Sequence, residues 1–394
     1  MPRRDQMQIS LPDMNAQWPG AVPPTAAYIH VPFCAHRCGY CDFTVVAGKD
    51  HLAGDYLRAL EAEISSLERP RPVQTLFIGG GTPTHLDARK LDQLLALTTT
   101  WFKLASDYEF SVEANPAALD AEKIDVLAAH GVNRVSLGVQ SFDPHVLELL
   151  ERDHDAAQVE IAVGLLTRRI PNFSLDLIFG VPGQSLELWR ETLARAVALG
   201  PAHISTYGLT FEKGTSFWSR RAKGVMQQAG DELERAMYAV AMDELPRHGF
   251  EQYELSNFAQ PGYRCRHNET YWAGQQYYGF GPGAARYLEG RRETNHRSVS
   301  TWMARVFSGR SPIGDVDVLA SADRARETLV VGLRRSDGVD RAAFRATTGF
   351  DLEEVAGAAI ARHCESGLLE RTAAGIRLTR EGRFLADTVI VDCL

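Results

Sequence analysis

The chain lacks any hydrophobic run long enough to cross a membrane. None of its segments approaches the ~20 consecutive apolar residues that a transmembrane helix requires. The N-terminal stretch MPRRDQMQISLPDMNAQWPG also lacks the apolar centre of a secretory signal. We therefore expect a cytoplasmic protein, in which thiols stay reduced and clustered cysteines indicate metal or redox chemistry more often than disulfides.

An excess of positive charge is absent as well. The 394 residues include 50 Asp and Glu against 42 Lys and Arg, and the formal net charge is −8. Because proteins that mainly bind nucleic acid usually carry a basic surface, no nucleic-acid partner is expected. With 45% hydrophobic residues, the chain can bury a substantial core, organised as one large domain and a smaller one.

Cysteine is scarce, yet three of the six cysteines fall within eight positions. Cys34, Cys38 and Cys41 form the spacing CxxxCxxC in VPFCAHRCGYCDF, with Phe43 where a further cysteine could stand. Three thiolates can hold zinc if another residue completes the shell, or they can be reduced thiols without a ligand. They can also hold three irons of a cubane cluster and leave the fourth open to an exchangeable ligand. The spacing favours the cluster.

Apolar β-rich runs alternate with helical patterns through the first half of the chain. The predicted strands are AAYIHV, QTLFIG, DYEFSVEA, RVSLGV, FSLDLIFG and HISTYGL. The predicted helices between them span residues 50–67, 87–101, 120–130, 156–168 and 186–199, and several open with an Asp suited to N-capping. Six successive β/α units predict a parallel sheet with helical crossovers, as a partial barrel or an open doubly wound sheet.

Polar groups follow the predicted strands. Active sites of parallel α/β folds gather at the carboxyl ends of the strands, so these groups are expected to converge on one rim. Each could be structural by itself, but the repeated position favours a shared site. After the cysteine loop, the strand ends carry Gly79-Gly80-Gly81-Thr82, Glu113, Gln140, Asp176 and Tyr207-Gly208. The glycine run lacks the Lys-Ser/Thr of a P-loop and suits an amino-acid-like ligand.

The cysteine motif after a first strand, with Tyr40 inside it, resembles the radical S-adenosylmethionine (radical SAM) superfamily. The segments YIHVPFC, GGGTPT, VEANP, SLGVQSF, DLIFGVPGQ and CRHNETYW resemble the oxygen-independent coproporphyrinogen III oxidase family, from about Tyr28 to the C-terminus. Within that family the chain is most similar to the HemW branch, described as haem chaperones. Phe43 stands where the oxidases carry an additional cysteine, and HNETYW matches the HNxxYW signature that the branch associates with haem.

The resemblance implies an α/β fold, a partial (β/α)6 radical-SAM barrel, that binds a [4Fe–4S] cluster and S-adenosylmethionine. Cys34, Cys38 and Cys41 would hold the cluster. The implied S-adenosylmethionine contacts are Tyr28, Tyr40, Gly80, Gly81, Thr82, Glu113, Gln140, Arg152 and Asp176, with Gly208 and Ala285 on the adenine side. A carboxylate can bind the cofactor's amino group or ribose hydroxyls, and an arginine can pair with its carboxylate. A flavodoxin- or ferredoxin-type reductant is an implied partner.

A second implied site is RCRHNETYW, residues 264–272. The resemblance implies haem contacts through His267, Asn268, Tyr271 and Trp272, with His267 as an axial ligand and the aromatic rings against the macrocycle. Without the resemblance, a structural histidine beside two core aromatics is the simpler interpretation. The following YYGFGPGAARY places Arg286 where the family more often has histidine.

The C-terminal part outlines a winged-helix-like module, in the order helix, helix, helix, strand, turn, strand, helix. Residues 311–394 contain eleven arginines, no lysine and fourteen acidic residues, so a cap or protein-docking surface is favoured over a DNA-binding face. The predicted divisions are a tether over 1–24, the barrel over 25–260, the HNxxYW segment and connector over 261–310, and the module over 311–394.

Three functions follow from these patterns. The first is a haem chaperone that delivers haem to an acceptor apoprotein. The second is a coproporphyrinogen oxidase that converts propionates to vinyl groups, and the third is an acidic winged-helix regulator that uses the cluster as a sensor. Phe43 and HNETYW favour the first over the second, and the negative charge disfavours the third. Whether the chain is an enzyme stays open.

Overall fold

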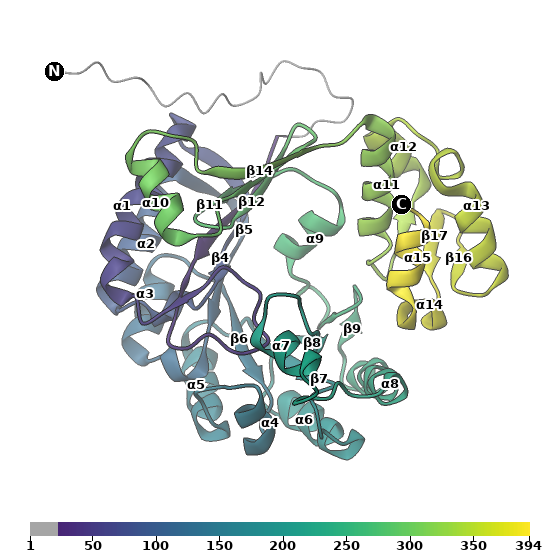
Figure 1. Ribbon diagram of the computed structural model, residues 1–394, viewed down its shortest axis with the longest axis horizontal. Coiled ribbons are helices and arrows are strands. Elements are labelled where there is room, and N and C mark those ends of the chain that lie inside the picture. The colour runs from purple at the N-terminus through teal and green to yellow at the C-terminus, as the bar shows by residue number, and fades with distance from the viewer. Residues whose placement is uncertain (1–22) are drawn as a thin grey trace.

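The computed structural model describes residues 23–394, so the tether predicted over 1–24 lies almost wholly outside the described residues. Six parallel strands form the centre in chain order: β1 (Ala26–Val31), β4 (Arg71–Gly80), β5 (Phe102–Ala114), β6 (Arg134–Gln140), β7 (Phe173–Phe179) and β8 (His203–Gly208). Four of the six predicted strands fall within these elements, and the other two, FSLDLIFG and HISTYGL, extend one residue beyond β7 and β8. Because neighbours in the sheet are also neighbours in the chain, the architecture is the partial barrel and not the doubly wound sheet, whose strand order reverses (Figure 1).

Crossover helices cover the outer side of this sheet (Figure 1). They are α1 (Ala53–Ile64), α2 (Ala88–Trp101), α3 (Ala121–Ala129), α5 (Ala156–Arg169) and α6 (Leu186–Ala198). Asp87, Asp120 and Asp155 each accept a hydrogen bond from the backbone N–H three residues later, as N-caps do. Asp50 lies in a 3-10 turn and pairs with His85 instead. None of the helices within residues 23–394 is long and apolar enough to cross a membrane.

The main sheet extends beyond the six predicted strands at both edges. One edge gains β11 (Tyr277–Phe280), parallel to β1, and then the antiparallel β12 (Ala285–Leu288), β13 (Arg291–Asn295) and β14 (Ile313–Val318). The other gains β10 (Asn257–Ala259) and β9 (Glu251–Gln252). Strand β14 thus belongs to the barrel sheet although it lies beyond the boundary predicted at 311. The HNETYW segment forms α9 (Arg266–Trp272) on the concave side of the sheet (Figure 1).

The C-terminal module has its own core and lies beside the open side of the barrel (Figure 1). Its elements are α11 (Ser321–Gly332), β15 (Val339–Asp340), α12 (Arg341–Thr348), α13 (Leu352–Glu365), β16 (Leu369–Arg371), β17 (Gly375–Leu378), α14 (Arg380–Phe384) and α15 (Ala386–Asp392). Three strands pair in the order β15-β17-β16, which gives the winged-helix outline. An ion pair of 2.7 Å between Arg235 of α8 (Asp231–Arg247) and Glu381 helps to fix the module on the barrel.

Two cross-strand Arg–Glu pairs differ in burial, so they test how burial changes the contribution of an ion pair to stability. Arg286 on β12 faces Glu293 on β13, with side-chain exposures of 10% and 9%. Arg377 on β17 faces Glu370 on β16, both 46% exposed. Glu293→Ala leaves a buried guanidinium short of its carboxylate and should lower the free energy of unfolding by about 3–5 kcal/mol. Glu370→Ala should lower it by less than about 1 kcal/mol. Denaturant titrations check both, and equal losses would contradict a structural role for Arg286.

Candidate functional site

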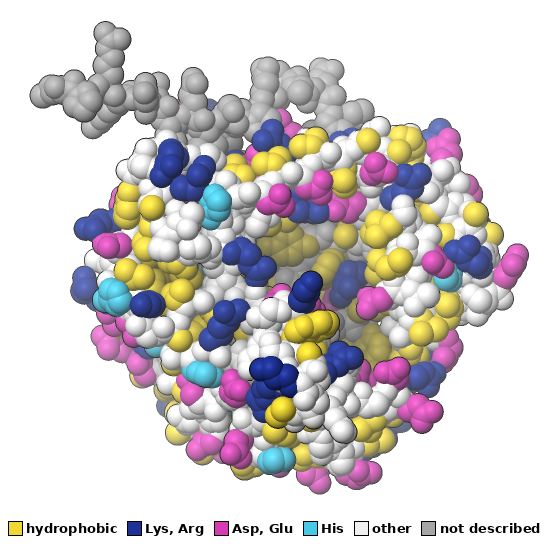
Figure 2. Space-filling model, viewed as in Figure 1, with side chains coloured by type: hydrophobic (Ala, Val, Ile, Leu, Met, Phe, Trp, Pro, Cys, Tyr) yellow, Lys and Arg dark blue, Asp and Glu magenta, His cyan; other side chains and the backbone are white. Residues whose placement is uncertain are grey.

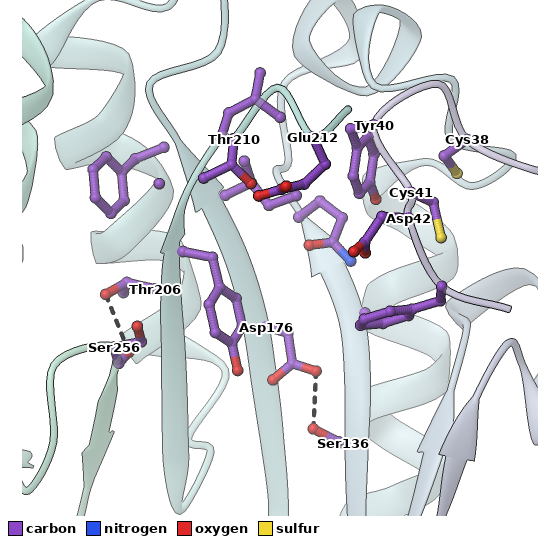
Figure 3. Close-up of a pocket in the computed structure, with 18 of the residues that line it drawn as sticks. Cys38, Tyr40, Cys41, Asp42, Ser136, Asp176, Thr206, Thr210, Glu212 and Ser256 are labelled. Carbon is purple, nitrogen blue, oxygen red and sulfur yellow. Dashed lines mark hydrogen bonds between the residues drawn. The ribbon is translucent and has the colours of Figure 1, made fainter. Parts of the chain in front are cut away.

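A cavity of about 780 Å³, here called the first cavity, opens at the carboxyl ends of the parallel strands. Its wall combines the loop after β1, the glycine bend after β4 and the ends of β5 to β8. Figure 3 shows the cysteine loop facing Asp176 at the end of β7. The predicted site residues that line it are Cys34, Cys38, Tyr40, Cys41, Gly80, Gly81, Thr82, Glu113, Gln140, Arg152, Asp176 and Gly208. The structure thus brings the strand-end groups to one rim, as parallel topology requires.

The three cysteines of the loop line this cavity. Cys34 Sγ lies 3.6 Å from Thr82 Oγ1, and Cys38 Sγ lies 3.7 Å from Arg152 Nη1. Burial raises the pKa of the Cys34 thiol to about 11. Among the described residues, no three His, Cys, Asp or Glu side chains are placed to hold one metal ion. Zinc needs its ligands at about 2.0–2.3 Å from a single ion, whereas each thiolate of a cubane binds its own iron.

Glycine is required in the bend after β4 because the backbone there touches the cysteine loop. Gly80 has a φ of +109°, and a Cβ on it would lie 2.4 Å from the His30 ring. A Cβ on Gly81 would lie 2.7 Å from the Phe33 carbonyl oxygen and 3.0 Å from Cys34 Sγ. The N–H of Gly80 donates a 2.8 Å hydrogen bond to Glu113 Oε2. The bend therefore links the cysteine loop to the carboxylate at the end of β5.

Glu113 and Asp176 are half-buried carboxylates on this rim. Desolvation raises the pKa of Glu113 to about 7 and also raises the pKa of Asp176. Asp176 accepts 2.8 Å hydrogen bonds from Ser136 and Ser205, the first of which is drawn in Figure 3. A bound ammonium group would favour the ionised form of both carboxylates. Ionised carboxylates also accept hydrogen bonds from ribose hydroxyls. The two serines were not predicted, since each lies inside a strand pattern that indicates only burial.

The C-terminal module supplies part of the first cavity's wall. Arg334, Arg383 and residues 384–388 line the cavity together with the cysteine loop. Figure 2 shows this face hollowed between the barrel and the module. Phe43 lies on the loop and is 56% exposed, so an apolar ring stands at the cavity where a thiol was considered. Sequence patterns gave no signal for the module's contribution, which depends on how the two parts pack.

A second cavity of about 350 Å³ lies between α9, β11, β12 and α11. Tyr271 and Trp272 of HNETYW line it, and so do Tyr28 and Ala285, for which S-adenosylmethionine contacts were expected. Tyr28 and Ala285 therefore line the same cavity as the aromatic residues of α9. The full lining is Tyr28, Tyr271, Trp272, Gly274, Gln275, Tyr277, Ala285, Tyr287, Arg292, Glu327, Thr328 and Val331.

His267 is buried below this second cavity, with an exposure of 1%. Its Nδ1 lies 2.9 Å from Thr75 Oγ1, and its Nε2 lies 2.8 Å from the hydroxyl oxygen of Tyr271. Phe77 stacks on the imidazole with ring centres 5.1 Å apart. Burial lowers the pKa of His267 to about 3, so the ring is neutral. Both nitrogens are already partnered, which differs from the exposed nitrogen expected of an axial ligand.

Glu109 explains why His267 lies so deep. Its carboxylate accepts hydrogen bonds from the backbone N–H groups of Arg266 (2.9 Å) and His267 (3.1 Å), which fixes the start of α9 against the sheet. The Cys265 thiol is fully buried and lies 3.5 Å from the same carboxylate. Asn268 is half-buried on α9 and lines neither of the two cavities.

Comparison with known proteins assigns the family. Residues 28–196 match the radical SAM superfamily, and residues 319–385 match the HemN C-terminal domain. The chain is 37% identical to the heme chaperone HemW of Bacillus subtilis over 372 residues, which cover 92% of this chain and 97% of the relative. The chain belongs to the HemW family. The heme chaperone HemW of Escherichia coli is 34% identical, with 94% and 98% of the two chains covered.

The solved structure of coproporphyrinogen III oxidase (HemN) from Escherichia coli has the same fold as this HemW-family chain. It superposes with a TM-score of 0.83 at 23% identity, over 96% of this chain and 91% of that one. The predicted membership of the radical SAM superfamily and of its HemW branch is thus confirmed. The winged-helix-like module corresponds to the HemN C-terminal domain.

Proposed function

We propose that this HemW-family protein binds haem reversibly and delivers it to an acceptor apoprotein. The observation that carries the proposal is the second cavity, where Tyr271 and Trp272 meet Tyr28, Tyr277 and Tyr287. Haem is flat and apolar except for its propionates, so walls of aromatic rings suit it. Relatives named as heme chaperones, similar over most of their length, support the same function.

The first cavity is proposed to hold a [4Fe–4S] cluster and S-adenosylmethionine. Cys34, Cys38 and Cys41 would bind three irons and leave the fourth for the cofactor's amino and carboxylate groups. When bound, this pair supplies one-electron cleavage of the sulfonium to an adenosyl radical. The chain's own residues would orient the cofactor: Glu113 and Asp176 through its amino group or ribose, and Arg152 through its carboxylate. A flavodoxin- or ferredoxin-type protein would be the reductant, in the cytoplasm.

The alternative function is oxygen-independent coproporphyrinogen III oxidase. The fold shared with HemN makes it a serious candidate. However, Phe43 offers an apolar ring to the first cavity and cannot ligate metal or exchange a hydrogen atom as a thiol can. The aromatic lining of the second cavity also suits a haem that is held and passed on.

Haem titration of the full chain tests the carrier function. Saturable binding of one haem per chain is expected, with a shifted Soret band. Trp272→Ala removes an indole from the second cavity and should weaken haem binding by about tenfold. Trp218→Ala, on α7 (Ser216–Ala222) and outside both cavities, is the matched control and should bind as the wild type does. Equal affinities of the two variants would show that haem, if bound, occupies another site.

A further inference from the structure

We propose that Tyr271, and not His267, supplies the axial ligand to haem iron in the second cavity, with His267 as its hydrogen-bond partner. This inference rests on the proposed haem-binding function and names the atom that holds the iron. It gives two residues of HNETYW separate roles: the tyrosine is the ligand and the histidine is a positioning residue.

The placement of His267 argues against direct ligation. An axial histidine needs a bare nitrogen facing the haem iron, but Thr75 and Tyr271 occupy both nitrogens of this ring. Phe77 covers one face of the imidazole, and Glu109 holds the backbone of the same turn. To ligate iron, His267 would have to give up its hydrogen bond to Tyr271 and leave its stacked position on Phe77. A buried imidazole without its partners would cost free energy with no compensation.

Tyr271 has the features that His267 lacks. It lines the second cavity, lies in the last turn of α9 beside Trp272, and carries an oxygen donor. Phenolate oxygen is an established haem ligand and a hard donor suited to ferric iron. As the iron–oxygen bond forms, the phenol O–H bond breaks and its proton leaves to solvent, while the neutral His267, whose Nε2 lies 2.8 Å away, stays as the hydrogen-bond partner of the phenolate oxygen. The imidazole thus orients the phenol oxygen toward the iron.

A second observation also points to a bound group in this cavity. The indole nitrogen of Trp272 is buried and has no hydrogen-bond partner within the described part of the chain. Buried donors are almost always satisfied, so this N–H lacks an acceptor that a bound group, such as a propionate oxygen, would supply. Arg334 lies over the indole at 4.6 Å from the ring centre, which fixes the ring and adds positive charge nearby.

Tyr28 is the main rival among the cavity's tyrosines. Its hydroxyl also meets an imidazole, since it lies 3.0 Å from His30 Nδ1, and His30 Nε2 bonds the Thr44 carbonyl oxygen at 2.7 Å. That carbonyl can only accept, so the proton of His30 is on Nε2 and the Tyr28 hydroxyl donates to Nδ1. Tyr28 lies on β1 and not in α9. The variants below separate the two residues.

Ferric haem added to the full chain provides the test. The wild type should show the visible charge-transfer band and resonance Raman modes of a phenolate-ligated high-spin iron. Tyr271→Phe should lose these signatures and bind haem about tenfold or more weakly. Tyr28→Phe and Tyr277→Phe, which remove other phenols of the same cavity, should keep them. His267→Gln should retain the phenolate modes at shifted frequencies, because the ligand stays and only its hydrogen-bond partner changes.

The outcomes separate the ligand from the function. Phenolate signatures that persist in Tyr271→Phe, or that disappear in Tyr28→Phe alone, would overturn the assignment. So would a nitrogen-ligated wild type that loses its axial ligand in His267→Gln. Haem binding without any phenolate signature overturns this inference alone, whereas a wild type that binds no haem overturns the proposed function as well. Unchanged circular dichroism and cluster content would show that each variant is folded.

Discussion

Cys38→Ala should abolish the iron–sulfur cluster. After anaerobic reconstitution, the wild type should hold about four irons per chain, and this variant should hold close to none. The cubane has only three protein ligands in this account, so the loss of one leaves two irons without protein support. Cys38 lies on the rim of the first cavity, where Arg152 approaches its sulfur at 3.7 Å. Iron and sulfide counting, with the visible absorbance of the cluster, measures the effect.

The other three cysteines are the matched controls. Cys265 and Cys393 are buried, Cys364 is half-buried, and all three lie outside both cavities. Their Ala variants should keep the cluster. If Cys265→Ala lost iron as completely as Cys38→Ala, the assignment of the cluster to the loop would be wrong.

Replacing Glu113 and Asp176 together by Ala should weaken S-adenosylmethionine binding by at least about 100-fold. Hydrogen bonds that involve a charged group each contribute about 1.5–3 kcal/mol, and two would be lost. The reconstituted cluster should remain, since neither carboxylate ligates it. Equilibrium binding of labelled S-adenosylmethionine to the reconstituted protein measures the change.

Two exposed carboxylates of the same cavity give the control for net charge. Glu212 and Asp387 line the first cavity but face solvent. Their double Ala variant also removes two carboxyl groups and should bind S-adenosylmethionine within about threefold of the wild type, because exposed charges interact weakly. Equal losses in the two double variants would mean that overall charge, and not the rim carboxylates, governs binding.

The barrel was predictable from the sequence because its signals are local. The run AAYIHV forms β1 at Ala26–Val31 as predicted, since its apolar residues are buried in the sheet. Asp87 and Asp120 begin helices where the capping rule places them. Once the strands are parallel, the convergence of Glu113 and Asp176 on one rim follows from topology alone.

The second cavity was not predictable from the same signals. Tyr28 and Ala285 follow family positions, yet the cavity that they share forms only because β11 pairs with both β1 and β12. His267 was expected to be an axial ligand of haem. The hydrogen bond that its backbone N–H donates to Glu109, 158 positions earlier, instead fixes the start of α9 inside the barrel. Such long-range hydrogen bonds leave no periodic pattern in the sequence. The order of helices and strands in the C-terminal module was predictable from the sequence. The packing that brings Arg383 to the wall of the first cavity was not.

Product analysis with both tetrapyrroles tests most directly whether this protein carries haem or acts on a porphyrin precursor. The reconstituted, reduced protein with S-adenosylmethionine would be incubated separately with haem and with coproporphyrinogen III, and the tetrapyrroles separated by chromatography. The account predicts that haem is bound one per chain and recovered intact on an added apo-haemoprotein, and that coproporphyrinogen III is unchanged. Vinyl products from coproporphyrinogen III, together with failure to bind or pass on haem, would contradict it.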